Sequence, residues 1–223
     1  MLARYPQIFH PLKAIFVHVP KTAGTSIENR LRETGSKASG HSAALGYRRA
    51  FPKEFASYFK FAVAREPVDR FLSAFYYLRQ TPVHPALNNQ AAHDCASPGE
   101  FAARLSAEPG LAARSVHLRP QWEFVCDHAG VVLVDEVYRF EALEAAWRDI
   151  GARLGIPPAA PGLPKTNRSL RPAAALDATA DVLAFVRQAY ARDFEVFNYP
   201  EVLTTDDADG LRYSDPGIPS VFI

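Results

Sequence analysis

Residues 14–31 constrain the fold of this 223-residue chain more than any other stretch. An apolar, β-branched run over residues 14–19 ends at Pro20, and because proline cannot donate to a sheet ladder, we expect a strand to end there. Ile27 and Leu31 follow at the spacing of one helix face. The stretch therefore predicts a strand, a loop of small residues and a helix.

The loop itself, residues 21–26, has the chemistry of a phosphate site. Small residues let backbone N–H groups and the positive end of the helix dipole converge on one anion, while Lys21 adds a full charge and three hydroxyls add donors. In P-loop nucleotidases the lysine follows the last glycine, whereas here Lys21 precedes Gly24, which disfavours kinase or GTPase chemistry. The alternative is an ordinary turn between a strand and a helix.

A second strand, turn and helix follow at residues 59–75. Residues 59–65 alternate and are rich in β-forming types, and Pro67 stands where a helix would begin. Arg65 would leave the carboxyl end of this strand able to direct two N–H groups onto a phosphate, and Ser73 can donate its hydroxyl from the helix. In isolation, a surface ion pair with Glu66 or Asp69 would explain Arg65 better than a phosphate site.

The remaining apolar patterns complete an alternation of strands and helices. The other predicted elements are strands at residues 121–126, 131–134 and 137–140, helices that begin after Ser97, span residues 141–154 up to Gly155, and run from a cap at Asp177 to Phe194, and a loop over residues 80–97. This alternation predicts a parallel sheet covered on both faces, with a site at the carboxyl ends of its strands.

Both loops resemble those of sulfotransferases that use 3′-phosphoadenosine 5′-phosphosulfate (PAPS), especially the carbohydrate-type, family 2-like branch. Pro-Lys-Thr-Ala-Gly-Thr-Ser at residues 20–26 is similar to the loop that holds the 5′-phosphosulfate. Arg-Glu-Pro-Val-Asp-Arg-Phe-Leu-Ser at residues 65–73 is similar to the element that binds the 3′-phosphate. Weaker similarities lie at residues 118–121, 137–141 and 165–169.

The resemblance covers nearly everything between residues 14 and 199 and implies an α/β fold with a three-layer, P-loop-like parallel sheet flanked by helices on both faces. We predict a single sulfotransferase-like domain over residues 1–223, with an irregular C-terminal tail over residues 200–223. The resemblance further implies transfer of a sulfuryl group from PAPS to a hydroxyl of a carbohydrate or glycolipid. The donor-binding residues that it implies are Lys21, Thr22, Ala23, Gly24, Thr25, Ser26, Arg65, Ser73, Asn167, Arg168 and Ser169.

Sulfuryl transfer needs a group that neutralises the departing phosphate and a group that takes the proton of the acceptor hydroxyl. Lys21 is the natural choice for the first. For the second we favour His41, because an imidazole titrates near neutrality and residues 39–42 lie between the two phosphate loops. Glu28 on the first helix is the alternative base. His18 also matches the family, but we expect it to be buried with a satisfied hydrogen bond.

Composition limits the other possibilities. The formal net charge is +1, which gives no global field for nucleic acid, and no apolar stretch approaches the length of a membrane span. Cys95, Cys126 and the histidines have no metal-ligand spacing, so no metal is expected, and two cysteines suit a reducing, cytoplasmic location. Two rival functions stay open, namely a nucleotide-binding protein of this fold without turnover and a P-loop-like kinase.

Overall fold

The computed structural model describes residues 7–32, 40–108, 110–157, 162–163 and 178–200. The chain forms two compact units, one of residues 1–65, 121–167 and 220–223 and the other of residues 66–120 and 168–219. Each unit is described by itself. A single domain over residues 1–223 stays a prediction, and the tail beyond Pro200 lies outside the described residues.

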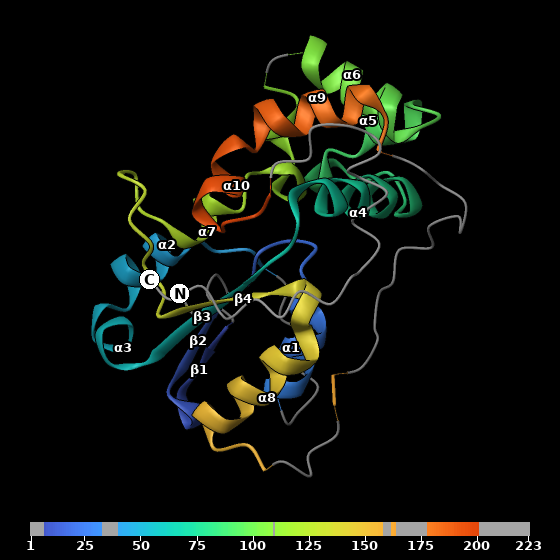
Figure 1. Ribbon diagram of the computed structural model, residues 1–223. Helices are drawn as coiled ribbons and strands as arrows, with labels where there is room; N and C mark the ends of the chain where they lie inside the picture. The colour runs from blue at the N-terminus through green and yellow to red at the C-terminus, as the bar shows by residue number, and fades with distance from the viewer. Residues whose placement is uncertain (1–6, 33–39, 109, 158–161, 164–177, 201–223) are drawn as a thin grey trace. The chain divides into compact units, whose positions relative to one another are not determined.

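The first unit contains a four-stranded sheet in the order β1-β2-β3-β4 (Figure 1). Its strands are β1 (Ile8–Phe9), β2 (Ala14–Val17), β3 (Phe59–Ala64) and β4 (Glu136–Arg139). β2, β3 and β4 run parallel, as predicted, whereas β1 is antiparallel to β2. The mixed α/β class is therefore confirmed, and the antiparallel edge strand β1 was not predicted. A three-layer, P-loop-like arrangement stays a prediction.

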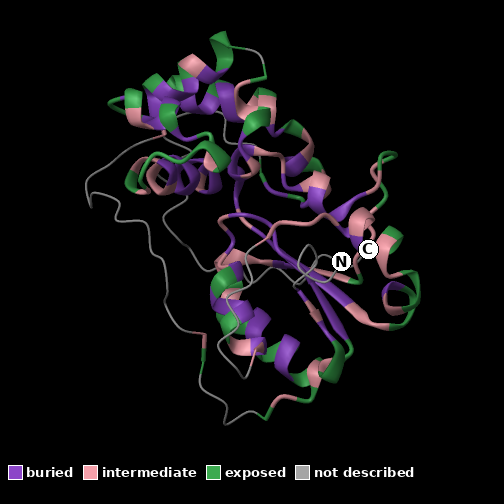
Figure 2. Cartoon of the chain, turned by 180° about the vertical axis from the view of Figure 1, so that it is seen from behind, coloured by how far each residue is buried: buried purple, intermediate pink, exposed green. Residues whose placement is uncertain are grey.

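One face of this sheet packs against α1 (Gly24–Leu31) and α8 (Leu143–Leu154). The buried cluster between them consists of Phe9, Ala14, Phe16, Ile27, Leu31, Phe61, Val63, Tyr138, Ala146, Trp147 and Ile150. All four residues of β2 are buried, as Figure 2 shows for the inner strands, so both faces of this strand are shielded from water. As predicted, α8 ends at Gly155, whose left-handed conformation (φ 68°) closes the helix.

Two of the predicted strands are wrong. Residues 122–125 form the short helix α7 (Trp122–Val125), and residues 131–134 contribute only an isolated bridge between Val132 and Cys126. Both runs are short and apolar, and a buried turn of helix cannot be told from a buried strand by such a pattern. The unit also contains α2 (Ala44–Ala50), α3 (Pro52–Ser57) and the 3-10 turns η2 (His10–Leu12) and η6 (Phe140–Ala142).

The described part of the second unit is helical. Its elements are α4 (Pro67–Gln80), η3 (Pro85–Leu87), α5 (Gln90–Asp94), α6 (Pro98–Ala107), η4 (Ala112–Arg114), η5 (Val116–Leu118), α9 (Ala180–Ala189) and α10 (Ala191–Val196). Phe71 on α4 stacks against Phe101 on α6 and contacts Phe185 on α9, which joins the three longer helices. None of the described helices is both long and apolar enough to cross a membrane.

Three predictions in this unit need correction. Residues 80–97 are not only loop, because they contain η3 and α5. The last predicted helix divides into α9 and α10 at Tyr190, whose backbone has φ −121° and ψ 21°. Thr179 caps α9, its hydroxyl accepting from the N–H of Val182 at 3.5 Å, whereas the predicted cap Asp177 lies outside the described residues.

Candidate active site

The first predicted loop is a tight turn between β2 and α1. Lys21 and Ala23 adopt left-handed conformations, with φ of 71° and 66°, and such conformations cost about 1–3 kcal/mol for residues other than glycine. Between them the side chain of Thr22 is fully buried, and its hydroxyl donates to the carbonyl of Val19 at 2.9 Å. Thr22 therefore uses its hydroxyl to close the turn.

The turn delivers the chain into the N-terminus of α1. The carbonyl of Ala23 accepts from the N–H groups of Ser26 and Ile27, at 2.9 and 3.2 Å. The N–H groups of the two residues before them, Gly24 and Thr25, have no acceptor within the helix, and the helix dipole adds partial positive charge there. Thr25 is exposed at this end and Ser26 is buried. Together with the half-buried Lys21, the helix start forms an electropositive corner suited to an anion.

Gly24 lets the imidazole of His18 lie against this helix start. A Cβ atom at Gly24 would meet the Cδ2 and Nε2 atoms of His18 at 2.0 Å, far inside contact distance. The φ of Gly24 is not in the left-handed region, so the small side chain is needed here for space and not for backbone freedom. His18, which directly follows β2, thus packs on the start of α1 beside the loop of residues 21–26.

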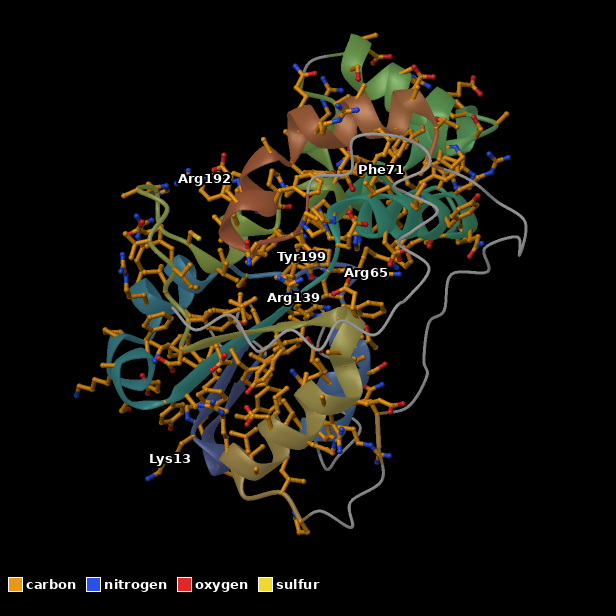
Figure 3. All side chains as sticks on the ribbon, viewed as in Figure 1. Lys13, Arg65, Phe71, Arg139, Arg192 and Tyr199 are labelled. Carbon is orange, nitrogen blue, oxygen red and sulfur yellow. The ribbon has the colours of Figure 1, made fainter. Side chains whose placement is uncertain are left out.

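Arg65 lies against the first predicted loop. It follows the carboxyl end of β3, the strand next to β2 in the parallel sheet, and Figure 3 labels its side chain. Its Nη1 donates to the carbonyl of Lys21 at 3.0 Å, and its guanidinium lies 4.0 Å from the ring centroid of Phe140. The stack on Phe140 stabilises the cation and fixes its plane. Arg65 and Lys21, two predicted donor-binding residues, therefore meet at one edge of the sheet.

Gln121 holds the backbone of Arg65 in place. The Oε1 atom of Gln121 accepts from the N–H of Arg65 at 3.0 Å, and its Nε2 donates to the carbonyl of Arg65 at 2.8 Å. The side-chain amide is fully buried. It makes the two hydrogen bonds to the backbone of Arg65 that a neighbouring strand would make inside a sheet. In the sequence, residues 118–121 show only a weak similarity to the family, and no pattern there indicates this role of Gln121.

His18 and Glu28 form a buried pair beside the anion loop. The Nδ1 of His18 lies 2.7 Å from Oε1 of Glu28, and both residues are buried. His18 is thus buried with a satisfied hydrogen bond, as expected. Glu28 also accepts from the Nε2 of Gln7 at 2.9 Å, so its carboxylate is held by two donors.

His41 lies against His18. Its Nδ1 is 3.1 Å from the carbonyl of His18, and the two ring centroids are 4.4 Å apart at an interplanar angle of 68°. A carbonyl can only accept, so the Nδ1 of His41 carries the proton, and the lone pair of the neutral ring is on Nε2. The structure therefore brings His41, Glu28 and the Lys21 loop into the same unit, around His18.

Burial sets the charge state of these groups. Burial alone would raise the pKa of Glu28, but the hydrogen bonds from His18 and Gln7 and the charge of His18 outweigh it and hold the pKa below the ordinary 4.5. Burial, with the charge of His18, lowers the pKa of His41 to about 4 from the ordinary 6.5. At neutral pH, Glu28 is therefore ionised and His41 is neutral.

Ser73 belongs to the second unit. It is buried in α4, a helix whose start is capped by the carboxylate of Glu66, which accepts from the N–H groups of Val68 and Asp69 at 2.9 and 2.6 Å. Arg70 on the same helix is fully buried and donates to the carbonyls of His117 and Arg119. The second arginine of the motif therefore braces residues 117–119. The predicted donor-binding residues Asn167, Arg168 and Ser169 lie outside the described residues.

Comparison with known families agrees with this geometry. A family model described as "Sulfotransferase family" (Sulfotransfer_2) matches residues 8–200, a range that includes both loops and the strands that carry them. The chain belongs to the sulfotransferase family. The predicted family 2-like resemblance is therefore confirmed, and it assigns the chain to sulfuryl transfer in general. Neither the curated proteins nor the solved structures give a significant match.

A sulfotransferase requires a sulfonate donor and a hydroxyl-bearing acceptor, and the residues around the Lys21 loop fit the anionic donor. Lys21, Arg65 and the N-terminus of α1 supply positive charge and N–H donors at one edge of the sheet. Among the described residues, no group of three or more histidine, cysteine or acidic side chains could hold a metal ion.

Proposed function

We propose that this sulfotransferase transfers a sulfuryl group from PAPS to a hydroxyl of a carbohydrate or glycolipid acceptor. The observation that carries the proposal is the bond between the Arg65 guanidinium and the backbone carbonyl of Lys21, because it places the arginine that follows β3 against the loop that carries Lys21 after the adjacent parallel strand. A donor with separate 5′ and 3′ anionic groups needs two such cations near each other. A nucleoside triphosphate has no 3′-phosphate for Arg65 to hold.

The position of each residue suggests which anionic group of PAPS it binds. Lys21 and the N-terminus of α1 hold the 5′-phosphosulfate, with Thr25 and Ser26 at the same helix start. Arg65 holds the 3′-phosphate, and its fixed fork suits two parallel hydrogen bonds to a phosphate. Further contacts to the donor from Ser73, Asn167, Arg168 and Ser169 are part of the same proposal, on the basis of the family resemblance.

The reaction breaks the bond between sulfur and the bridging phosphate oxygen and forms a bond between sulfur and the acceptor oxygen. Lys21 stabilises the negative charge left on the phosphate. The neutral His41 receives the hydroxyl proton at Nε2, because its Nδ1 already donates to His18. Glu28 is the alternative base, but its Oε1 already accepts from two donors, His18 and Gln7. We therefore assign Glu28 to holding His18.

A transfer assay tests this function. The protein is incubated with PAPS carrying radioactive sulfur and with a panel of glycans and glycolipids, and labelled products are separated and counted. We expect a labelled glycan product with the wild-type protein and none with His41→Gln, although this variant still binds 3′-phosphoadenosine 5′-phosphate. Binding of the bisphosphate without transfer to any member of the panel would instead favour the nucleotide-binding protein without turnover.

The proposed location is the cytoplasm. Cys95 and Cys126 are buried thiols, which suits a reducing compartment. Localisation of a tagged full-length protein in the producing cell, by fractionation, tests this part of the proposal, and recovery in an oxidising compartment would contradict it.

A further inference from the structure

Gln7 links three separate segments of the first unit through one buried side-chain amide. Its Nε2 donates to Oε1 of Glu28 at 2.9 Å and to the carbonyl of Gly40 at 2.8 Å, and its Oε1 accepts from the hydroxyl of Tyr47. Gln7 and Tyr47 are both fully buried. The matched family range begins at residue 8, so Gln7 stands just outside it.

The orientation of this amide is forced by chemistry. A carboxylate and a backbone carbonyl can only accept, so the NH₂ group of Gln7 must face Glu28 and Gly40. The Oε1 atom then faces Tyr47, which must donate. A reversed amide would place two acceptor oxygens against each other in a buried site, which is costly. The backbone of Gln7 is fixed as well, since its carbonyl accepts from the N–H of Phe16 in β2 at 3.0 Å.

The two acceptors of Gln7 lie on either side of the proposed proton acceptor. Glu28 binds His18, whose carbonyl accepts from Nδ1 of His41. Gly40 immediately precedes His41 in the chain. The backbone before His41 and the partner of His41 are thus both tied, directly or through Glu28, to the same nitrogen of Gln7.

We propose that Gln7 is a positioning residue of the active site, which fixes the carboxylate of Glu28 and the backbone that carries His41 in one arrangement. This role rests on the proposed function, because it matters for turnover only if His41 receives the proton. Gln7 makes no described bond to Lys21 or Arg65. It therefore sets the geometry of proton transfer and leaves donor binding unchanged.

Titration of the histidine rings by NMR tests this role without any substrate. Gln7→Met keeps the size of the side chain and removes both donated bonds. In the wild-type protein, burial and the charge of His18 hold the pKa of His41 near 4, Lys21 lowers it further, and Glu28 and the bond to the His18 carbonyl oppose them. Release of residues 40–41 exposes the ring to water, so we expect this pKa to rise toward 6.5 in Gln7→Met, by at least about one pH unit.

Tyr47→Phe is the matched control, because it removes a hydrogen bond of the same buried amide but leaves both Nε2 bonds in place. We expect His41 to titrate as in the wild-type protein. If Gln7→Met does not fold, Gln7→Glu makes the same test, since a carboxylate of similar size cannot donate to Glu28. An unchanged His41 titration in a folded Gln7 variant would overturn the proposal, as would an equal change in Tyr47→Phe.

Kinetic measurements on the same variants separate this role from a general loss of structure. Gln7→Met is expected to lower kcat by about tenfold and to move the acid limb of the pH profile upward, with the affinity for 3′-phosphoadenosine 5′-phosphate unchanged within about twofold. A wild-type protein that does not bind the bisphosphate would refute the proposed function, whereas the NMR titration would still decide the role of Gln7.

Discussion

Replacing His41 by glutamine should remove a part of the acid sensitivity of this protein. In the folded protein burial holds the pKa of His41 at about 4, whereas an unfolded histidine titrates near 6.5. Between these values the unfolded state binds a proton that the folded state does not, so the free energy of unfolding rises with pH. His41 therefore contributes stability that is fully present above pH 6.5 and is lost as the pH falls toward 4.

The expected magnitude follows from the two pKa values. Each pH unit between them is worth about 1.4 kcal/mol, and at pH 5 the folded protein has lost about 2 kcal/mol relative to pH 7 through His41 alone. A loss of this size is a large part of the 5–15 kcal/mol that stabilises a typical domain. Glu28, whose pKa is lowered in the folded state, adds a loss of the same sign at lower pH.

Urea unfolding at pH 7 and pH 5 measures this effect. We expect the drop in the free energy of unfolding between the two pH values to be about 2 kcal/mol smaller in His41→Gln than in the wild-type protein. His128→Gln, at an exposed histidine, is the matched control and should keep the wild-type drop. Equal drops in the wild-type protein and in His41→Gln would show that His41 is not buried in its neutral form.

Three further predictions follow from contacts around the loops. Gly24→Ala should lower the free energy of unfolding by about 1–3 kcal/mol in urea titrations, because the new Cβ displaces the His18 ring. Arg65→Ala should weaken binding of 3′-phosphoadenosine 5′-phosphate by about tenfold to a hundredfold in calorimetry, as expected for a lost charged hydrogen bond. Gln121→Leu should destabilise the fold by about 1–3 kcal/mol for each group of Arg65 left unpaired, measured by thermal unfolding.

Two of these variants have a matched control elsewhere in the chain. Gly162→Ala places its Cβ in open space and should leave stability unchanged. Arg48→Ala, at an exposed position on α2, should leave bisphosphate affinity unchanged. Tight binding by Arg65→Ala would remove this arginine from the donor site, and a stable Gln121→Leu would show that the end of β3 does not need the amide.

The parallel part of the sheet could be predicted because each of its first two strands, and the helix that follows it, has a pattern within a short stretch of sequence. Residues 14–19 and 59–65 are apolar runs that end in a proline or precede one closely, and each is followed by a helical spacing. The edge strand β1 could not be predicted, since two residues have no period. It forms because the left-handed turn at Lys13 (φ 48°) reverses the chain onto β2.

Some residues of the candidate site could be predicted from the sequence and others could not. Lys21 and Arg65 could be predicted to meet, because adjacent parallel strands end at one edge of the sheet and a cation follows each. The roles of Gln7, Tyr47 and Gln121 could not be predicted, because no sequence pattern indicates which groups a glutamine amide or a tyrosine hydroxyl will bond in the folded protein. Gln7 and Gly40 are 33 residues apart, and only the folded chain brings them together.

The proposed donor site is tested most directly by calorimetric titration of the purified protein with 3′-phosphoadenosine 5′-phosphate and, separately, with ATP, both without added metal. We expect tight binding of the bisphosphate and little binding of ATP, because Lys21 and Arg65 hold anions at two positions. Preferential binding of ATP, or no binding of the bisphosphate, would contradict the proposed donor site.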